Sequence, residues 1–203
     1  MKLRDARLLL VTDPRPDLTS RVAAAVRGGV DIVQLRDKHA TREELLPLAE
    51  ELRASCEREG AIFAVNDDPE LARICGADGV HLGQEDATIQ EARELLGPGA
   101  IIGLSAGSVQ EACRAVEEAA DYLGVGTVFA TPTKDDAEVE GLALVEQMAW
   151  EDLSVPWFAI GGIGLENAGQ VADAGAPGFA VVRAILDADD PEAAARELRS
   201  LLP

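Results

Sequence analysis

Residues 32–66 read IVQLRDKHATREELLPLAEELRASCEREGAIFAVN. The stretch begins with a short apolar run at residues 32–36 and ends with another at residues 62–66. Between the two runs, apolar residues recur at the three- and four-residue spacing of an amphipathic helix: Leu45, Leu48, Leu52 and Cys56. The order of strand, helix and strand predicts a βα repeat with parallel strands.

The same alternation continues along the whole chain. Eight apolar runs rich in β-formers occur, at residues 8–12, 32–36, 62–66, 79–83, 101–105, 122–126, 157–161 and 178–182. Capping patterns mark several helix starts between them: Thr41, Asp68, Thr88, Ser108 and Asp190. Eight βα units in 203 residues is the smallest size of a (β/α)8 barrel. We therefore predict an α/β fold, a (β/α)8 TIM barrel, in which residues 1–203 form a single domain.

An open, doubly wound parallel sheet is the alternative architecture. The repeat covers the chain from end to end, and no early G-x-G-x-x-G follows the first apolar run. No linker or low-complexity segment indicates a second domain. These observations favour the barrel.

The chain is strongly acidic, with 18 Lys and Arg against 37 Asp and Glu, which gives a formal net charge of −19. A like charge of this size argues against nucleic-acid or anionic-membrane binding. Only three of the basic residues are lysines: Lys2, Lys38 and Lys134. We interpret the acidic surface as a solvation feature and hypothesise that it suits a salt-rich cytosol.

The sequence gives no sign of export or membrane insertion. No stretch approaches about 18 uninterrupted apolar residues, and the N-terminus lacks a signal-peptide pattern. The cysteines lie far apart without a C-x-x-C, so they favour neither a disulfide framework nor a zinc site: Cys56, Cys75 and Cys113. We expect a soluble cytoplasmic protein, whose oligomeric state stays open between a monomer and a homo-oligomer.

In a (β/α)8 barrel the chemistry collects at the carboxyl ends of the strands. The second apolar run ends with Gln34, Arg36 and Lys38 on one face, because side chains alternate along a strand. An arginine fork beside a lysine point charge suits a diphosphate. The alternative interpretation is a solvated strand end.

Two carboxylates follow the neighbouring runs. Asp67 comes after the third run and Asp86 after the fourth, and adjacent parallel strands lie only about 5 Å apart, so the two can converge. Two carboxylates beside two cations suggest a Mg²⁺ ion that keeps waters and bridges phosphate oxygens. The alternative is helix capping, which we expect for Asp68.

Two further segments carry polar residues at strand ends. The fifth run closes with Ser105, whose hydroxyl is equally compatible with a cap or a turn. Residues 127–137 form the longest stretch without periodicity, a candidate lid. Its hydroxyls and rare lysine suit phosphate capture: Thr131, Thr133 and Lys134.

The last two runs predict a phosphate site. The seventh ends in Gly161, Gly162, Ile163 and Gly164, and glycine N–H groups after strands 7 and 8 bind phosphate in many barrels. The two histidines lack metal-ligand spacing, and His81, inside the fourth run, favours ordinary packing over catalysis. The sequence shows no convincing arrangement of a nucleophile beside a general base. The residues therefore indicate two anionic substrates and one metal, without covalent catalysis by the enzyme.

Taken together, these residues resemble the thiamine-phosphate synthase family. The match runs from the first strand to the last, in order and with compatible spacing. The motifs that carry it are residues 34–38 (QLRDK), 66–68 (NDD), 78–86 (DGVHLGQED), 124–126 (GVG), 131–134 (TPTK) and 160–163 (IGGI). Members of this family are (β/α)8 barrels that join a hydroxymethylpyrimidine diphosphate to a thiazole phosphate. They release diphosphate and form thiamine phosphate.

Carried over position by position, the resemblance implies roles for particular residues. The pyrimidine diphosphate would be held by Gln34, Arg36, Lys38, Asn66, Ser105 and Lys134. The Mg²⁺ ion would be held by Asp67 and Asp86. The thiazole phosphate would be surrounded by Thr131, Thr133, Gly162, Val182 and Arg183. The family's reaction is dissociative, and charge on the leaving diphosphate would be stabilised by Arg36, Lys38 and Lys134.

Two departures from the family's pattern stand out. Arg183 replaces a residue that is often a small hydroxyl, and Ala106 and Gly107 replace a more usual Thr-His after the serine. Arg183 can still bind a phosphate through its backbone N–H. The alternatives are a thiazole tautomerase-like isomerase, whose histidine is expected near the fifth strand, and a non-catalytic phosphate-binding barrel. The paired aspartates and Lys134 favour the synthase.

Overall fold

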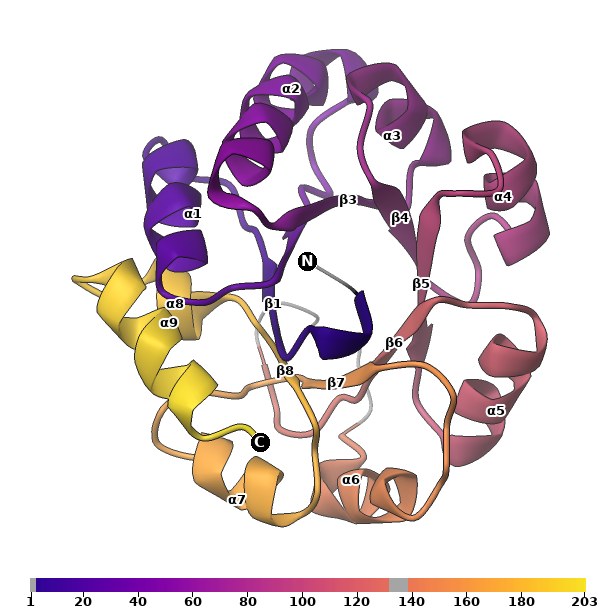
Figure 1. Cartoon of the computed structure of the whole chain (residues 1–203), viewed down its shortest axis with the longest axis vertical. Coiled ribbons are helices and arrows are strands. Elements are labelled where there is room, and N and C mark those ends of the chain that lie inside the picture. The colour runs from indigo at the N-terminus through magenta and orange to yellow at the C-terminus, as the bar shows by residue number, and fades with distance from the viewer. Residues whose placement is uncertain (1–2, 132–138) are drawn as a thin grey trace.

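The computed structural model describes residues 3–131 and 139–203. Eight parallel strands form a closed barrel in chain order, and the last strand pairs with the first (Figure 1). The predicted (β/α)8 TIM barrel is therefore confirmed, and the open sheet is excluded. The strands are β1 (Leu8–Val11), β2 (Ile32–Leu35), β3 (Ile62–Asn66), β4 (Gly79–Leu82), β5 (Ile101–Ala106), β6 (Tyr122–Val125), β7 (Trp157–Ile160) and β8 (Phe179–Val181).

Helices surround the barrel on its outer face (Figure 1). They are α1 (Leu18–Arg27), α2 (Arg42–Glu59), α3 (Pro69–Cys75), α4 (Ile89–Leu96), α5 (Val109–Glu117), α6 (Gly141–Ala149), α7 (Ala168–Asp173), α8 (Arg183–Leu186) and α9 (Pro191–Ser200). A short 3-10 helix, η1 (Leu3–Asp5), precedes β1. None of the helices within the described residues is both long enough and apolar enough to cross a membrane.

The predicted caps form, with one difference. Thr41 and Thr88 each make a full capping box at the starts of α2 and α4. Ser108 accepts from the N–H of Glu111 at 3.2 Å, but the Glu111 carboxylate accepts from Gly107 at 2.7 Å. This carboxylate therefore orders the loop after β5 rather than the cap itself. A side-chain cap before a proline is made by Asp68 and Asp190.

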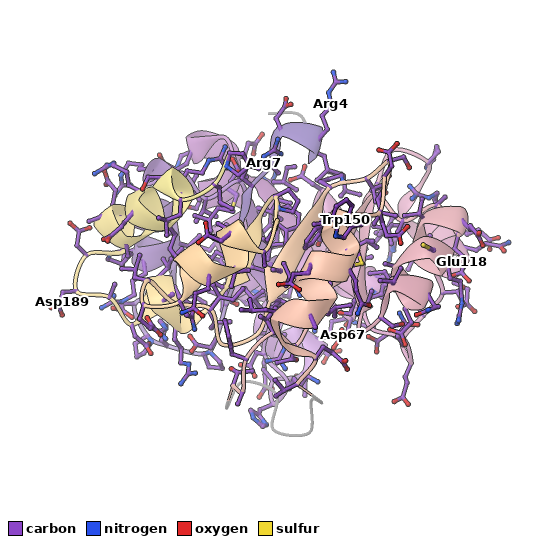
Figure 2. All side chains as sticks on the ribbon, turned by 90° about the horizontal axis from the view of Figure 1, so that it is seen from below. Arg4, Arg7, Asp67, Glu118, Trp150 and Asp189 are labelled. Carbon is purple, nitrogen blue, oxygen red and sulfur yellow. The ribbon has the colours of Figure 1, made fainter. Side chains whose placement is uncertain are left out.

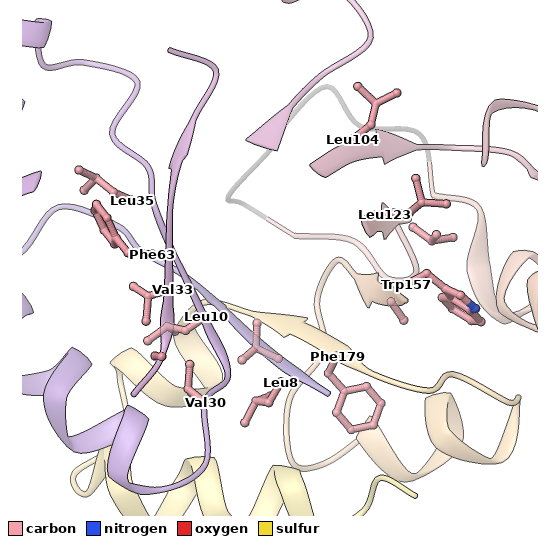
Figure 3. Close-up of a cluster of buried hydrophobic side chains, with 14 of the residues drawn as sticks. Leu8, Leu10, Val30, Val33, Leu35, Phe63, Leu104, Leu123, Trp157 and Phe179 are labelled. Atoms are coloured by element: carbon pink, nitrogen blue, oxygen red, sulfur yellow. The ribbon is translucent and has the colours of Figure 1, made fainter. Parts of the chain in front are cut away.

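Side chains alternate between two hydrophobic clusters. Leu8 and Leu10 of β1 face the helices, whereas Leu9 faces into the barrel. Figure 3 shows part of the outer cluster, where Leu8 and Phe179 lie close together. The inner cluster consists of Ala6, Leu9, Val11, Ile32, Ile62, Tyr122, Phe158 and Ala180. This alternation is the period-two pattern of a strand that is buried on both faces.

The amino end of the barrel is covered. Helix η1 lies over the centre of the barrel in Figure 1, and Leu3 and Ala6 pack with the inner cluster. The opposite end, where the strands finish, is therefore the end at which loops can form a site.

A repeated pair of hydrogen bonds joins strands at the amino end. Aspartates precede β2, β4 and β6: Asp31, Asp78 and Asp121. Each aspartate donates its main-chain N–H to one residue of the preceding strand and accepts that residue's N–H on its carboxylate. The partners are Leu8, Phe63 and Ile102, at distances between 2.7 and 3.0 Å.

The first of these aspartates makes additional contacts. Asp31 is buried, accepts the N–H of Arg7 at 2.6 Å, and pairs with the guanidinium of Arg199 on α9. Asp78 is exposed, so water can reach its acceptor position. Burial therefore makes the Asp31 contact the more costly one to lose.

We predict that Asp31→Ala lowers the free energy of unfolding by about 1–3 kcal/mol, because two main-chain N–H groups lose their acceptor away from water. Asp78→Ala is the matched control, and its loss should be less than half as large. Urea unfolding of the two variants measures both values. A larger loss for Asp78→Ala would contradict the role assigned to burial.

Candidate active site

The residues predicted to form the site lie where the strands end. Those that the structure describes are Gln34, Arg36, Lys38, Asn66, Asp67, Asp86, Ser105, Thr131, Gly162, Val182 and Arg183. The strands are parallel, so these residues share the end of the barrel opposite η1. Figure 2 shows Asp67 toward this end and Arg4 and Arg7 at the other. Two predicted residues, Thr133 and Lys134, lie outside the described ranges.

The polar end of β2 is fixed by its two neighbouring strands. The Gln34 side chain is buried and donates from Nε2 to Oδ1 of Asn66, the last residue of β3, at 2.6 Å. The main-chain N–H of Arg36 donates to Oγ1 of Thr12 at 2.9 Å. Thr12 is fully buried and was missed by the sequence analysis, although it is the polar residue that closes the first apolar run.

Asp67 adopts an unusual backbone conformation. Its φ is +62°, in the left-handed region that non-glycine residues occupy only occasionally, with Asp and Asn enriched. The Asp67 N–H donates to the carbonyl of His81 on β4 at 2.8 Å, which holds the backbone in this conformation. Such strain persists where the surrounding structure imposes it and is common at functional sites.

The carboxylates of Asp67 and Asp86 meet, as predicted. They lie within hydrogen-bond reach of each other, and Asp86 is oriented by the N–H of Gly83 at 2.7 Å. Burial and the neighbouring Asp86 carboxylate raise the pKa of Asp67 to about 6, while Lys38 and Arg36 act in the opposite direction. This arrangement favours a cation, or a shared proton, between the two carboxylates.

The chemistry of these donors fits a hard divalent cation with an incomplete protein shell. Within residues 3–131 and 139–203, no group of three His, Cys, Asp or Glu side chains could hold a metal ion. A cation held by Asp67 and Asp86 would therefore take its other ligands from water or from a bound phosphate, which is the usual behaviour of Mg²⁺. Asp68 instead caps α3, as expected, and it also pairs with two guanidinium nitrogens of Arg42, Nε and Nη2.

A cavity opens beside the carboxylate pair. Its volume is about 310 Å³, and it lies between the ends of β2 and β3 and the starts of α2 and α3. Its polar lining includes Lys38, Arg42, Asn66 and Asp67. The carboxylates of Asp37 and Asp68 also line the cavity, so its polar lining mixes two cations with three carboxylates and one amide.

His81 lies inside the barrel below these residues. It is 7% exposed, with Nδ1 at 3.1 Å from Oη of Tyr122 and Nε2 at 3.0 Å from Oγ of Ser105. Burial lowers the pKa of His81 to about 4, although the Asp86 charge acts in the opposite direction. His81 is thus a buried residue, as its packing interpretation expects, but both of its ring nitrogens are hydrogen bonded.

A glycine turn follows β7 at the same end of the barrel. Gly162 has a φ of +60°, and a Cβ atom there would lie 2.8 Å from Cβ of Phe129. Its carbonyl accepts from Nδ2 of Asn167 at 2.9 Å, and Oδ1 of Asn167 accepts from Gly164 at 2.9 Å. The turn therefore needs glycine and packs on the segment that leads to Thr131.

The end of β8 supplies the remaining predicted residues. Val182 is half-buried and packs against both hydrophobic clusters, whereas Arg183 is exposed and begins α8. Arg15 joins this region to β1, with bonds to Asp13 and Asp187, both at 2.8 Å. The glycine turn follows β7 and helix α8 follows β8, and these two strands are paired.

Comparisons with known proteins agree on one family. Residues 8–185 match the sequence model of the family described as thiamine monophosphate synthase. A thiamine-phosphate synthase from Thermus thermophilus is 48% identical over 97% of both chains. Another, from Synechocystis, is 47% identical over 99% of this chain, which spans only 58% of that relative's length. A solved thiamine phosphate pyrophosphorylase from Pyrococcus furiosus superposes with a TM-score of 0.87 at 38% identity. The match covers 98% of this chain and 96% of the solved chain.

We predict that His81 makes the protein less stable as the pH falls below neutral. Its pKa of about 4 in the fold lies below the ordinary value near 6.5, so between these values the unfolded chain binds a proton that the folded chain does not. The free energy of unfolding should fall by about 2 kcal/mol between pH 7 and pH 5 from this group alone.

Urea unfolding across this pH range tests the prediction. His81→Gln should remove this part of the pH dependence, whereas His39→Gln, which changes an exposed histidine, should retain it. If wild type and His81→Gln showed the same dependence on pH, His81 would not be the group responsible.

Proposed function

Because the chain belongs to the thiamine monophosphate synthase family, we propose that it joins 4-amino-5-hydroxymethyl-2-methylpyrimidine diphosphate to thiazole phosphate. The products are thiamine phosphate and diphosphate. One observation carries the proposal: the Asp67 and Asp86 carboxylates meet beside the cationic end of β2. Two small phosphorylated molecules are the proposed partners, and the cytoplasm is the proposed location.

The diphosphate half of the site is supported by Arg36 and Lys38. Both cations act electrostatically on Asp67, and Lys38 lines the cavity beside it. A diphosphate in this position would meet a guanidinium and an ammonium group together. When bound by Asp67 and Asp86, Mg²⁺ would neutralise charge on the phosphate oxygens.

The pyrimidine ring is proposed to lie over the interior of the barrel. Gln34 donates to Asn66, which leaves the Gln34 carbonyl oxygen as an acceptor and the Asn66 amide as a donor. Ser105 is half-buried on β5, and its carbonyl accepts from Nε2 of Gln84 at 2.6 Å. An aminopyrimidine carries both donor and acceptor atoms at its edge, so it complements this set of groups.

The thiazole phosphate is proposed to bind at the glycine turn and the start of α8. Gly162 and Arg183 supply main-chain N–H groups on adjoining strands, and the exposed Arg183 side chain adds a cation where the family often has a small hydroxyl. Thr131 directly follows Phe129 and Ala130, the two residues that contact Gly162 in the turn. The proposal also assigns Thr133 to this phosphate and Lys134 to the diphosphate, both from the sequence alone.

The proposed reaction needs charge stabilisation and no enzyme nucleophile. The bond between the pyrimidine methylene carbon and the diphosphate oxygen breaks, and the departing oxygens gain charge beside Arg36 and Lys38. The thiazole nitrogen then forms a bond to the methylene carbon. Fixed cations that face the developing charge lower the barrier without reorganisation, and a site that excludes water protects the reactive carbon from hydrolysis.

We predict that the wild-type protein forms thiamine phosphate and diphosphate in equal amounts from the two phosphorylated substrates and Mg²⁺. Chromatography of the products and a diphosphate assay provide the measurement. Conversion of a thiazole phosphate into an isomer, without diphosphate release, would instead support the isomerase alternative. Binding of phosphorylated ligands without any product would support the non-catalytic barrel.

Asp86→Ala should lower kcat by about 10²-fold or more, which corresponds to about 3 kcal/mol of lost transition-state stabilisation. The expected cause is loss of one of the two carboxylates that would hold Mg²⁺. Glu85→Gln is the matched control, because it removes one exposed negative charge from the same loop and should leave kcat nearly unchanged. Near-normal turnover of Asp86→Ala at saturating Mg²⁺ would remove Asp86 from the site.

A further inference from the structure

Three side chains form a hydrogen-bonded row inside the barrel, from its middle to its mouth. Tyr122 on β6 is fully buried, His81 on β4 is 7% exposed, and Ser105 on β5 is half-buried. The distances along the row are 3.1 Å from Tyr122 Oη to His81 Nδ1 and 3.0 Å from His81 Nε2 to Ser105 Oγ. Only Ser105 has been given a role at the substrate.

A glycine on β5 leaves the space in which this row forms. In the strand register, Gly103 pairs with His81 on one side and with Tyr122 on the other. A Cβ atom at Gly103 would lie 2.2 Å from Cζ of Tyr122 and 2.6 Å from Nδ1 of His81. The tyrosine hydroxyl and the imidazole therefore meet across β5, in space that any other residue at position 103 would occupy.

Both ring nitrogens of His81 are hydrogen bonded to uncharged groups, Oη of Tyr122 and Oγ of Ser105, so no carboxylate partner favours a charged form of this buried ring. Burial is the main cause of its lowered pKa, and the charge of Asp86, above it in the β4–α4 loop, is too weak to offset burial. On β6 the facing group is Tyr122, whose own pKa is raised by burial, so the phenol stays protonated. A neutral imidazole carries one N–H and one lone pair, so the row must have a direction.

The buried phenol sets that direction. Its proton needs an acceptor, and the other ring that faces Tyr122 is Phe158, in an edge-to-face contact with centroids 5.9 Å apart. If Tyr122 donates to Nδ1 of His81, the imidazole N–H is on Nε2 and donates to Ser105. The opposite tautomer would leave the phenol proton without an acceptor in the barrel interior, so it should be disfavoured by about tenfold or more.

We propose that Tyr122 and His81 are positioning residues that make the Ser105 hydroxyl a hydrogen-bond donor toward the barrel mouth. Because Ser105 Oγ accepts from His81, its own proton is free for a ligand. Ser105 therefore selects a substrate with an acceptor atom at this point, such as a ring nitrogen of a pyrimidine. The consequence for substrate rests on the proposed function, whereas the direction of the row does not.

The tautomer of His81 can be measured directly on the free protein. The chain has only two histidines, so ¹⁵N-histidine NMR resolves both rings, and His39→Gln assigns them. We expect His81 to be neutral and protonated on Nε2 at pH 7. Protonation on Nδ1, or on both nitrogens, would overturn the proposal whether or not the protein makes thiamine phosphate.

Tyr122→Phe tests the origin of the direction, because it keeps the ring and removes only the hydroxyl. The dominance of the Nε2–H tautomer should fall at least several-fold, and KM for the pyrimidine diphosphate should rise about 5–10-fold while KM for the thiazole phosphate stays constant. Phe158→Leu is the control, since it alters the packing of the Tyr122 ring and keeps the hydroxyl; the tautomer should not change. Unchanged tautomer populations in Tyr122→Phe would overturn the proposed role of the phenol.

A double-mutant cycle separates positioning from general structure. If Tyr122 acts through Ser105, Tyr122→Phe should raise KM for the pyrimidine diphosphate in the wild-type background but not in Ser105→Ala. Equal effects in both backgrounds would show that Tyr122 does not act through Ser105. A wild-type protein without synthase activity would overturn the proposed function alone, because the NMR measurement would still decide the direction of the row.

Discussion

The reciprocal hydrogen bonds between strand-leading aspartates and the preceding strands determine which residues face the barrel interior. Asp31 exchanges two bonds with Leu8, and Asp78 does the same with Phe63. A shift by one residue would break both bonds and would also turn every side chain of the strand to the other face. The aspartates at the amino end therefore specify the register on which the polar residues at the other end depend.

That register places small residues where large neighbours need space. Gly103 lies between His81 and Tyr122, and a Cβ atom on Gly124 would lie 3.3 Å from the His81 ring. The interior near β4, β5 and β6 is thus filled by two rings that lean over glycines, rather than by one aliphatic side chain per strand. This packing brings the polar atoms of Tyr122 and His81 into the barrel interior, and each of them is hydrogen bonded, as buried polar groups require.

Much of the fold and of the site follows from local rules applied to the sequence. Strand ends predicted the meeting of Asp67 and Asp86, because neighbouring parallel strands place their ends side by side. The position of Asp68 before a proline predicted its capping role and distinguished it from Asp67, which was predicted to bind a metal ion. The sequence did not predict the role of Thr12, because this role depends on a hydrogen bond to Arg36 at the end of the neighbouring strand. It also did not predict the contact of Tyr122 with His81, because the two side chains meet across β5, over a glycine. Such contacts depend on the register and side-chain packing, which residue order alone does not reveal.

The net charge of −19 is compatible with the proposed anion binding at the mouth, because of how the cations are distributed. Among the described residues, all ion pairs within 4 Å are made by arginines, and most lie on the helices, such as Arg53 with Glu57 and Arg73 with Glu70. Lys38 takes part in none of them and stays exposed beside the cavity. Charges beyond about 8 Å are largely screened at physiological salt. A phosphate bound at this end of the barrel would therefore respond to Lys38 and Arg36 more than to the acidic surface, because both cations lie near enough to act on Asp67.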